Sequence, residues 1–287
     1  MTWTVVAKKD FRDAVQSRAL WALVSVFVLL SVLSSYAYVE VPQLFGEPGG
    51  ATFGGLVFFT VGLTSLFMPL AAIVVCYKSL AGERELGSIK LLLSLPTTRL
   101  HVYAGKTVGR AAVLAFGLGV GLLVGLGFGA VLLGAVAVVP IVLFLVATLG
   151  FAVAYASIMV GLSATTGSTT RATTLALGFF VVFELFWDVV PVAILYVVNG
   201  FELPTSMPDW IFPVMQVSPS SAYFSTVVTL LPDLAGSVGA GGQGGAAMSP
   251  AEVEPFYTTP EIGIVVLALW TLVAFLIGYT RFESADF

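Results

Sequence analysis

Long apolar runs, each about as long as a lipid bilayer is thick, dominate the sequence. A membrane-spanning helix needs about 20 mostly apolar residues. Six runs meet this requirement: 20–40, 57–76, 111–133, 141–163, 173–197 and 261–280. The pattern predicts an all-α fold, a polytopic membrane helix bundle with six transmembrane helices in a single domain, 1–287.

The segments that join these runs differ greatly in length. Residues 134–140 leave room only for a short turn between the third and fourth runs, whereas 198–260 separate the fifth from the sixth. The long segment contains the low-complexity run Gly236 to Gly245. Such a composition is typical of a flexible loop without chemistry of its own.

Composition supports a lipid environment. Hydrophobic residues make up 58% of the chain, charged residues 10%, and the mean hydropathy is +1.02. A soluble domain carries roughly a quarter charged residues. The single cysteine, Cys76, excludes a disulfide within the chain, and the single histidine, His101, excludes a metal site that needs two imidazoles.

The distribution of basic residues predicts the orientation. All twelve Lys and Arg residues lie in four segments on one side: 1–19, 77–110, 164–172 and 281–287. None lies in the three segments on the other side: 41–56, 134–140 and 198–260. Because basic loops stay in the cytoplasm, both termini are expected on the cytoplasmic side. The protein itself is expected in the cytoplasmic membrane of a prokaryote.

The opposite side is acidic. Its carboxylates are Glu47, Glu202, Asp209, Asp233, Glu252 and Glu254. An acidic exterior without lysine fits a salt-loving organism such as a halophilic archaeon. The solubility of an ordinary exposed loop explains the same residues equally well, and both interpretations stay open.

The N-terminal segment 1–19 has an amphipathic pattern. Its larger apolar residues recur every four positions: Trp3, Ala7, Phe11 and Val15. Basic residues, among them Arg12 and Arg18, point elsewhere. This pattern predicts an interfacial helix that lies in the membrane plane with its cations near anionic headgroups.

A second amphipathic pattern follows the second run. Apolar residues recur at helical spacing and acidic residues surround them, as in Leu86 and Ile89 beside Glu83 and Glu85. Pro96 disfavours a helical Leu95 and should end the helix. A short helix of this kind either lies at the headgroup boundary or docks into a groove of a partner protein.

Two stretches carry a resemblance to a known family. Residues 83–89 read ERELGSI, residues 92–99 read LLSLPTTR, and Gly105 and Lys106 follow, while residues 9–18 read KDFRDAVQSR. Together with the number of spans and the loop lengths, these stretches resemble the ABC-2 type permeases, the membrane subunits of a class of ATP-binding-cassette exporters. Within that family the chain is similar to the permeases of nitrous-oxide-reductase maturation systems.

The resemblance implies a division of labour. ATP and Mg²⁺ would bind a separate ATPase subunit on the cytoplasmic face, a second permease copy or paralogue would complete the pore, and this chain would bind no cofactor, metal or nucleic acid. Loop 77–110 would couple to the ATPase through eight residues: Glu83, Glu85, Leu86, Gly87, Ile89, Leu93, Pro96 and Arg99. Alternatively, the charges among them only solvate the loop. On the coupling interpretation, Glu83→Lys or Glu85→Lys uncouples ATP hydrolysis from transport without unfolding the bundle.

Two kinds of catalysis find no support in the residues. Gly105-Lys106-Thr107 resembles the end of a phosphate-binding loop, but Leu100 stands where that loop needs its first glycine. No HExxH motif is present, and His101 lies in a loop instead of at membrane depth, which excludes an intramembrane protease. The chain is therefore expected not to be an enzyme.

Glycines recur on one face of the third run. They are spaced four residues apart: Gly117, Gly121, Gly125 and Gly129. Small residues at this spacing let two membrane helices approach closely. The close contact is expected either within the bundle or at a subunit interface.

The fifth run carries two carboxylates, Glu184 and Asp188, four residues apart. Charge at the bilayer centre is unfavourable by about 2.5–3.5 kcal/mol, so both should face the bundle interior, a water-filled cavity or each other. They could form a cargo pathway or a proton relay, which would suit a self-sufficient proton-coupled secondary transporter as the alternative function. They could equally lie outside the bilayer if the helix ends early, near Pro191.

Overall fold

The computed structural model describes residues 2–44, 51–94, 96–202, 208, 210–232 and 259–285 of the 287-residue chain, and every regular element in these ranges is a helix. Several predicted features lie outside the described residues. They are the run 236–245 and the acidic residues Glu47, Asp209, Asp233, Glu252 and Glu254.

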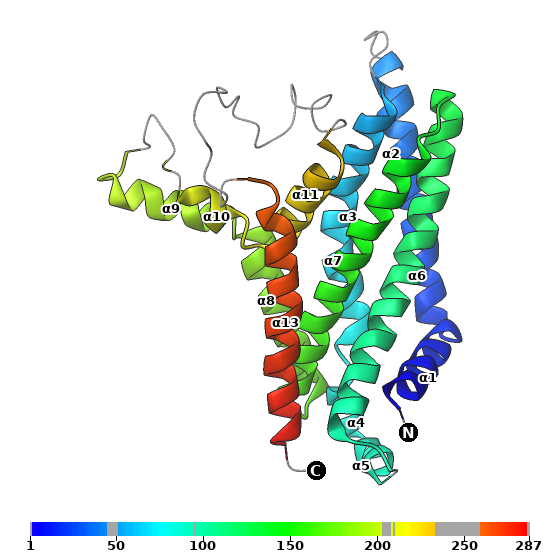
Figure 1. The fold of residues 1–287 in the computed structure, drawn as a ribbon, viewed down its shortest axis with the longest axis vertical. Helices are drawn as coiled ribbons and strands as arrows, with labels where there is room; N and C mark the ends of the chain where they lie inside the picture. Colours follow the sequence, from blue (N-terminus) through cyan, green and yellow to red (C-terminus); the bar gives the residue numbers. More distant parts are fainter. Residues whose placement is uncertain are drawn as a thin grey trace.

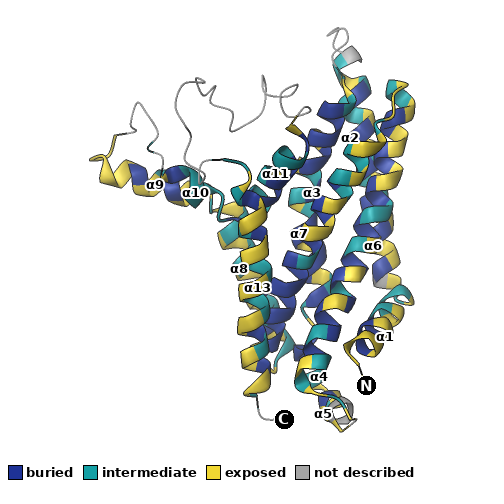
Figure 2. Cartoon of the chain, in the orientation of Figure 1, coloured by how far each residue is buried: buried dark blue, intermediate teal, exposed yellow. Residues whose placement is uncertain are grey.

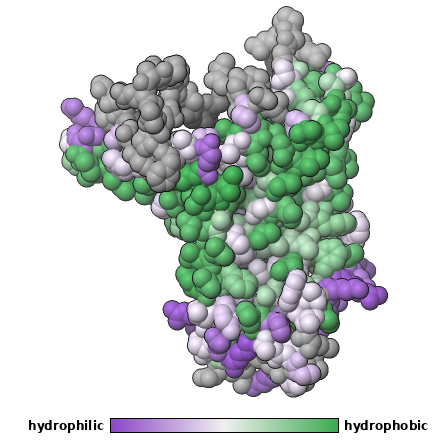
Figure 3. All heavy atoms as spheres, viewed as in Figure 1, coloured by the Kyte–Doolittle hydropathy of each residue, from purple (hydrophilic) through white to green (hydrophobic). Residues whose placement is uncertain are grey.

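Five helices are long and apolar enough to cross a membrane. They are α2 (Arg18–Leu44), α3 (Phe53–Cys76), α6 (Arg99–Leu133), α7 (Val138–Ala164) and α13 (Ile262–Glu283). Figure 1 shows them running roughly side by side along the long axis. Figure 3 shows an apolar belt across the visible face of the bundle, as expected for a lipid-embedded protein. The predicted all-α membrane bundle is confirmed.

The fifth predicted span is not one straight helix. Residues 173–197 fall on α8 (Thr169–Phe180), the π-helical turn η1 (Val181–Leu185) and α9 (Val189–Val198), with a bend of 59° before α9. Pro191 lies in the first turn of α9, where its missing N–H is tolerated, but in an uninterrupted helix its ring would collide with the carbonyl of Trp187, so the helix breaks before α9. In Figure 1, α9 and α10 (Ile211–Met215) lie across the direction of the bundle.

Helix α7 occupies the centre of the bundle, in contact with α3, α6, α8, α11 (Pro219–Leu230) and α13. Its large side chains Phe144, Phe151 and Tyr155 are fully buried. Phe151 stacks on Tyr223 of α11 with 4.3 Å between ring centroids. Burial is concentrated on the faces that the helices turn toward one another, while their outer faces are largely exposed (Figure 2).

One end of the bundle, here called the basic end, carries α1 (Trp3–Val15), α4 (Ala81–Glu85), α5 (Ser88–Leu93) and the first turns of α6. Both described ends of the chain lie there (Figure 1). Helix α6 begins at Arg99, twelve residues before the predicted span. Its 35 residues measure about 50 Å, against about 30 Å of hydrocarbon, so residues 99–110 extend the helix beyond the bilayer instead of forming a loop.

Candidate functional site at the basic end

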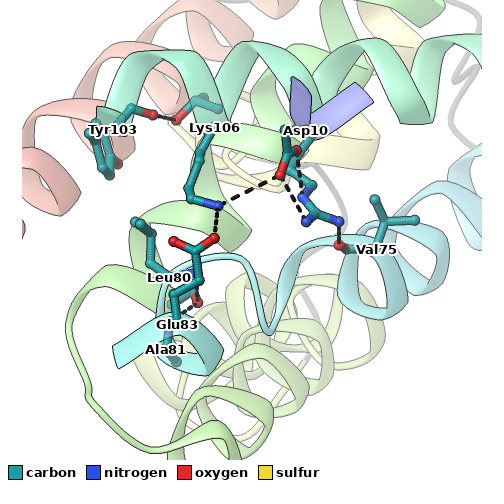
Figure 4. Close-up of polar contacts among 10 residues, drawn as sticks. Asp10, Val75, Leu80, Ala81, Glu83, Tyr103 and Lys106 are labelled. Atoms are coloured by element: carbon teal, nitrogen blue, oxygen red, sulfur yellow. Dashed lines mark hydrogen bonds and ion pairs between the residues drawn. The ribbon is translucent and has the colours of Figure 1, made fainter. Parts of the chain in front are cut away.

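A buried network of charges joins three segments at the basic end. Lys106 of α6 places its Nζ 2.7 Å from Glu83 Oε1 of α4 and 3.7 Å from Asp10 Oδ1 of α1. Figure 4 shows these side chains converging. Lys106 is only 4% exposed and Asp10 8%. Because a buried charge is tolerated only when it is paired, the network holds α1 and α4 against α6.

Arg110, one turn further along α6, extends the network. Its Nε lies 2.9 Å from Asp10 Oδ2, and its NH2 group donates to Asp10 Oδ1 at 3.0 Å. Its NH1 group donates to the carbonyl of Val75 at 2.8 Å, close to the end of α3 (Figure 4). The two basic residues of α6 therefore connect α1, α3 and α4.

Glycines on α6 allow α1 to approach closely enough for these contacts. A Cβ atom on Gly105 would lie 2.6 Å from Val6 Cβ, and one on Gly109 would lie 3.0 Å from Asp10 Cβ. Real Cβ atoms do not approach other atoms so closely without displacing them. The two glycines thus continue, at the same four-residue spacing, the glycine face recognised further along the helix.

The connection between α3 and α4 is fixed to α7 by one hydroxyl. Ser163 Oγ accepts hydrogen bonds from the amides of Leu80 and Ala81 at 3.2 and 3.0 Å and donates to the carbonyl of Tyr77 at 2.8 Å. Arg84 donates to the carbonyl of Ala164, near the end of the same helix. The start of the loop is therefore bound to the centre of the bundle.

The sequence predicted one amphipathic helix after the second span, but the structure has two short helices there, α4 and α5. Gly87 separates α4 from α5 with φ +72°, in the left-handed region that favours glycine. Leu86, next to it, is 84% exposed, whereas Ile89 is 1% exposed. The two residues therefore do not share one outward face. Helix α5 ends at Leu93, before the exposed Pro96, and the Leu93 side chain lies outside the description.

The charged residues of the loop make contacts within this chain. Glu83 pairs with Lys106, as above. Glu85 Oε2 accepts a hydrogen bond of 2.8 Å from the amide of Thr169, the first residue of α8. Arg99 donates to carbonyls at the end of α13, those of Glu283 and Ala285 among them. Glu83, Glu85 and Arg99 thus have partners on neighbouring helices of this chain, and their expected role in coupling to an ATPase stays a prediction.

The N-terminal helix forms where expected but turns a different face to the bundle. Its buried residues are Val6, Ala7 and Asp10. Trp3 is 44% exposed, and Arg12 and Arg18 are also exposed. Phe11 is partly buried and packs edge-on against Phe116 of α6, with 6.1 Å between ring centroids. The apolar pattern in the sequence did not predict that Asp10 is buried. A buried acidic residue can be inferred only when its basic partners, which lie far away in the sequence, are known.

The four glycines in the middle of α6 contact α2 and α3 of the same chain. A Cβ on Gly121 would lie 2.2 Å from a ring carbon of Phe27, and one on Gly125 would lie 2.4 Å from Ser31 Cβ. Gly117 faces Val24, and Gly129 faces Leu56 of α3. Ser35 also donates to the carbonyl of Gly125 at 2.8 Å. This face of α6 is thus occupied within the bundle.

Glu184 and Asp188 do not share a face. Glu184 lies in η1 and accepts a hydrogen bond from the hydroxyl of Tyr155, a fully buried residue of α7. Asp188 is exposed and lies at the bend that precedes α9. The helix breaks between the two carboxylates, before Pro191, so they do not lie on one continuous helix, and the early helix end that Pro191 suggested is present.

Sequence reasoning missed Asp10, Lys106 and Arg110 as a group. A signal was present: Lys106 and Arg110 are four residues apart, directly beside glycines that are also four residues apart. On a helix such residues share a side, so two cations beside a close-packing face indicated an acidic partner.

Comparison with known proteins agrees with this architecture. A family model described as ABC-2 family transporter protein matches residues 4–287. The probable ABC transporter permease protein NosY of Pseudomonas aeruginosa is 28% identical over 233 residues, covering 78% of this chain and 80% of the relative. The protein of the same description from Stutzerimonas stutzeri is 25% identical over 288 residues, covering 97% and 96%. The chain belongs to the ABC-2 family of membrane transporter proteins.

Proposed function

We propose that this chain is the permease subunit of an ATP-driven exporter, and that a separate ABC ATPase docks at the basic end, on the cytoplasmic face. ATP and Mg²⁺ would bind that ATPase. A second permease copy or paralogue would complete the translocation path.

One observation carries the proposal. The turn between α4 and α5 exposes Leu86 almost completely, 84%, at the tip of a segment otherwise bound to the bundle. In a chain of an ABC transporter family, an exposed leucine on a turn that is held in place at the basic end suits a partner's groove.

The contacts behind this turn supply a route for mechanical coupling. Displacement of α4 would act on α6 through Glu83 and Lys106, on α8 through Glu85 and Thr169, and on α7 through Ser163. Asp10 extends the same route to α1. A movement of the docked ATPase would therefore reach several helices together. Glu184, bonded to Tyr155 beside the bend of α8 and α9, remains the candidate for the cargo pathway.

The test replaces the exposed leucine. Leu86→Asp should abolish co-purification of an ABC ATPase from membranes of the source organism, because the change puts a charge on the docking surface without entering the core. Val136→Asp is the matched control, since Val136 is also largely exposed, 67%, but lies in the turn between α6 and α7 at the other end.

The readout is mass spectrometry of the purified complex together with its ATP hydrolysis. Loss in Leu86→Asp and retention in Val136→Asp is the expected result. Equal ATPase recovery in the two variants would refute docking at this turn. A functional preparation that transports without any ATPase would favour a secondary transporter instead.

A further inference from the structure

The outer surface of the bundle contains an apolar hollow between α2 and α3. Its volume is about 170 Å³, and among its lining residues are Leu23, Phe27, Phe67, Ala71 and Gly117. Phe27, Ala71 and Gly117 are buried and form the floor, whereas Val74 on the wall is 55% exposed. The hollow therefore opens toward the surroundings of the bundle, at the level of the apolar belt.

A second hollow, of about 240 Å³, lies nearer the basic end, and its lining includes Asp13, Ser17, Val74 and Arg110. Val74 lines both hollows. On each of α2, α3 and α6, the residues that line the first hollow lie nearer the bilayer centre than those that line the second. The two hollows thus lie end to end with Val74 between them, and together they are here called the groove. From Val75 to Phe67 of α3 it extends about 12 Å, close to the roughly 15 Å hydrocarbon depth of one leaflet.

The second hollow, here called the mouth of the groove, is lined by a positively and a negatively charged side chain. Arg110 is 23% exposed in its side chain, and each of its two terminal nitrogens donates one hydrogen bond, NH1 to Val75 and NH2 to Asp10, so each keeps a second N–H for a ligand. Asp13 is exposed beside it. Ser17 Oγ accepts from the amide of Leu20, so its own proton is available to donate.

An aromatic side chain marks the same level as the membrane interface. Trp21 of α2, one turn beyond Ser17, is 50% exposed and donates its Nε1–H to the carbonyl of Val15. Tryptophan is enriched where the hydrocarbon meets the headgroups. The charged mouth therefore lies at headgroup depth and the apolar hollow lies in hydrocarbon.

We propose that this groove is a binding site for one phospholipid with an amine-bearing headgroup. The phosphate would accept hydrogen bonds from Arg110 and Ser17, the ammonium group would pair with Asp13, and one acyl chain would fill the hollow above Gly117. Such a lipid matches all three parts of the groove: its phosphate matches Arg110, its ammonium group matches Asp13, and its acyl chain matches the apolar hollow. The site does not depend on the docking of an ATPase.

The test measures lipid retention by native mass spectrometry of the full chain in detergent, titrated with phosphatidylethanolamine or phosphatidylglycerol of identical acyl chains. Val74→Trp fills the groove from an exposed position, so the core is not disturbed. Val146→Trp is the matched control on the exposed face of α7, because Val146 is 56% exposed and does not line the groove. Asp13→Asn removes the partner of the ammonium group.

Phosphatidylethanolamine should bind more tightly than phosphatidylglycerol. Val74→Trp should weaken its binding about tenfold, equivalent to 1.4 kcal/mol, and Val146→Trp less than about twofold. Asp13→Asn should remove the preference between the lipids. Equal loss in the two tryptophan variants, or equal or tighter binding of phosphatidylglycerol to the unaltered chain, would overturn the proposal. So would a change in subunit stoichiometry with unchanged lipid retention, because the groove would then be a contact between copies.

Discussion

Lys106 is the residue on which the basic end depends. Its ammonium group is almost completely enclosed, and its two carboxylate partners come from segments 96 and 23 residues earlier in the chain. Breaking a buried ion pair by removing one partner usually destabilises a protein by 3–5 kcal/mol. The Glu83 side chain is 33% exposed, but its Oε2 is buried without a hydrogen-bond partner, so loss of Lys106 would leave this carboxylate poorly solvated.

We expect Lys106→Met to lower the free energy of unfolding by about 3 kcal/mol, because Glu83 loses its cation and Asp10 keeps only Arg110. Adding Glu83→Gln should restore part of the loss. Thermal unfolding in detergent measures both variants. A destabilisation below about 1 kcal/mol, the ordinary value for an exposed pair, would show that the network is solvated.

The same geometry alters an expectation from the sequence. Glu83→Lys would place a second cation beside buried Lys106, so the bundle is expected to lose stability as well as coupling. Glu85→Lys lacks this problem, because Glu85 is exposed and contacts only the start of α8 among the described hydrogen bonds. Of the two charge reversals, only Glu85→Lys remains a clean test of uncoupling.

At the scale of elements, the glycine face of α6 determines how closely α1 and α2 pack. The face runs from Gly105 to Gly129 at intervals of four residues, interrupted at the buried Val113. Its first part receives α1 and its second part receives α2. Membrane helices gain association energy mainly from such close packing, because lipid supplies no hydrophobic drive.

Gly125→Ala should therefore destabilise the bundle by about 1–3 kcal/mol, the usual effect of overpacking. The added methyl group would lie 2.4 Å from Ser31 Cβ and within 3.0 Å of that residue's backbone, which cannot rotate away. Gly127→Ala is the matched control two residues along the same helix, where nothing lies within 4 Å of the added Cβ. Unfolding curves that coincide for both variants would contradict a packing role.

At the scale of the whole molecule, the charges and the apolar belt define two ends of a membrane bundle. The basic end holds the proposed ATPase surface and both described chain ends, and α9 and α10 lie across the bundle away from it (Figure 1). The positive-inside rule predicts that the basic end lies in the cytoplasm. The two named relatives are bacterial, and the expectation of a halophilic archaeal source stays a prediction.

Cysteine labelling tests this orientation. Cys76 is fully buried, so the wild-type chain provides the unlabelled background. Leu86→Cys should react with a membrane-impermeant maleimide only after cells are opened, whereas Val136→Cys should react in intact cells, because both positions are largely exposed but lie at opposite ends. Labelling of residue 86 in intact cells would show that the basic end faces the outside, and it would contradict the docking proposal.

The sequence by itself determined that the chain is a lipid-embedded helical bundle, which end is basic and to which family it belongs. The preference for lipid follows from local composition, which adds up along each run without knowledge of neighbours. Only the tertiary structure decided that Lys106 joins Glu83 to Asp10 and that Arg99 binds the end of α13. Each of these depends on segments distant in the sequence meeting at fixed distances, and helical periodicity contains no information about those distances.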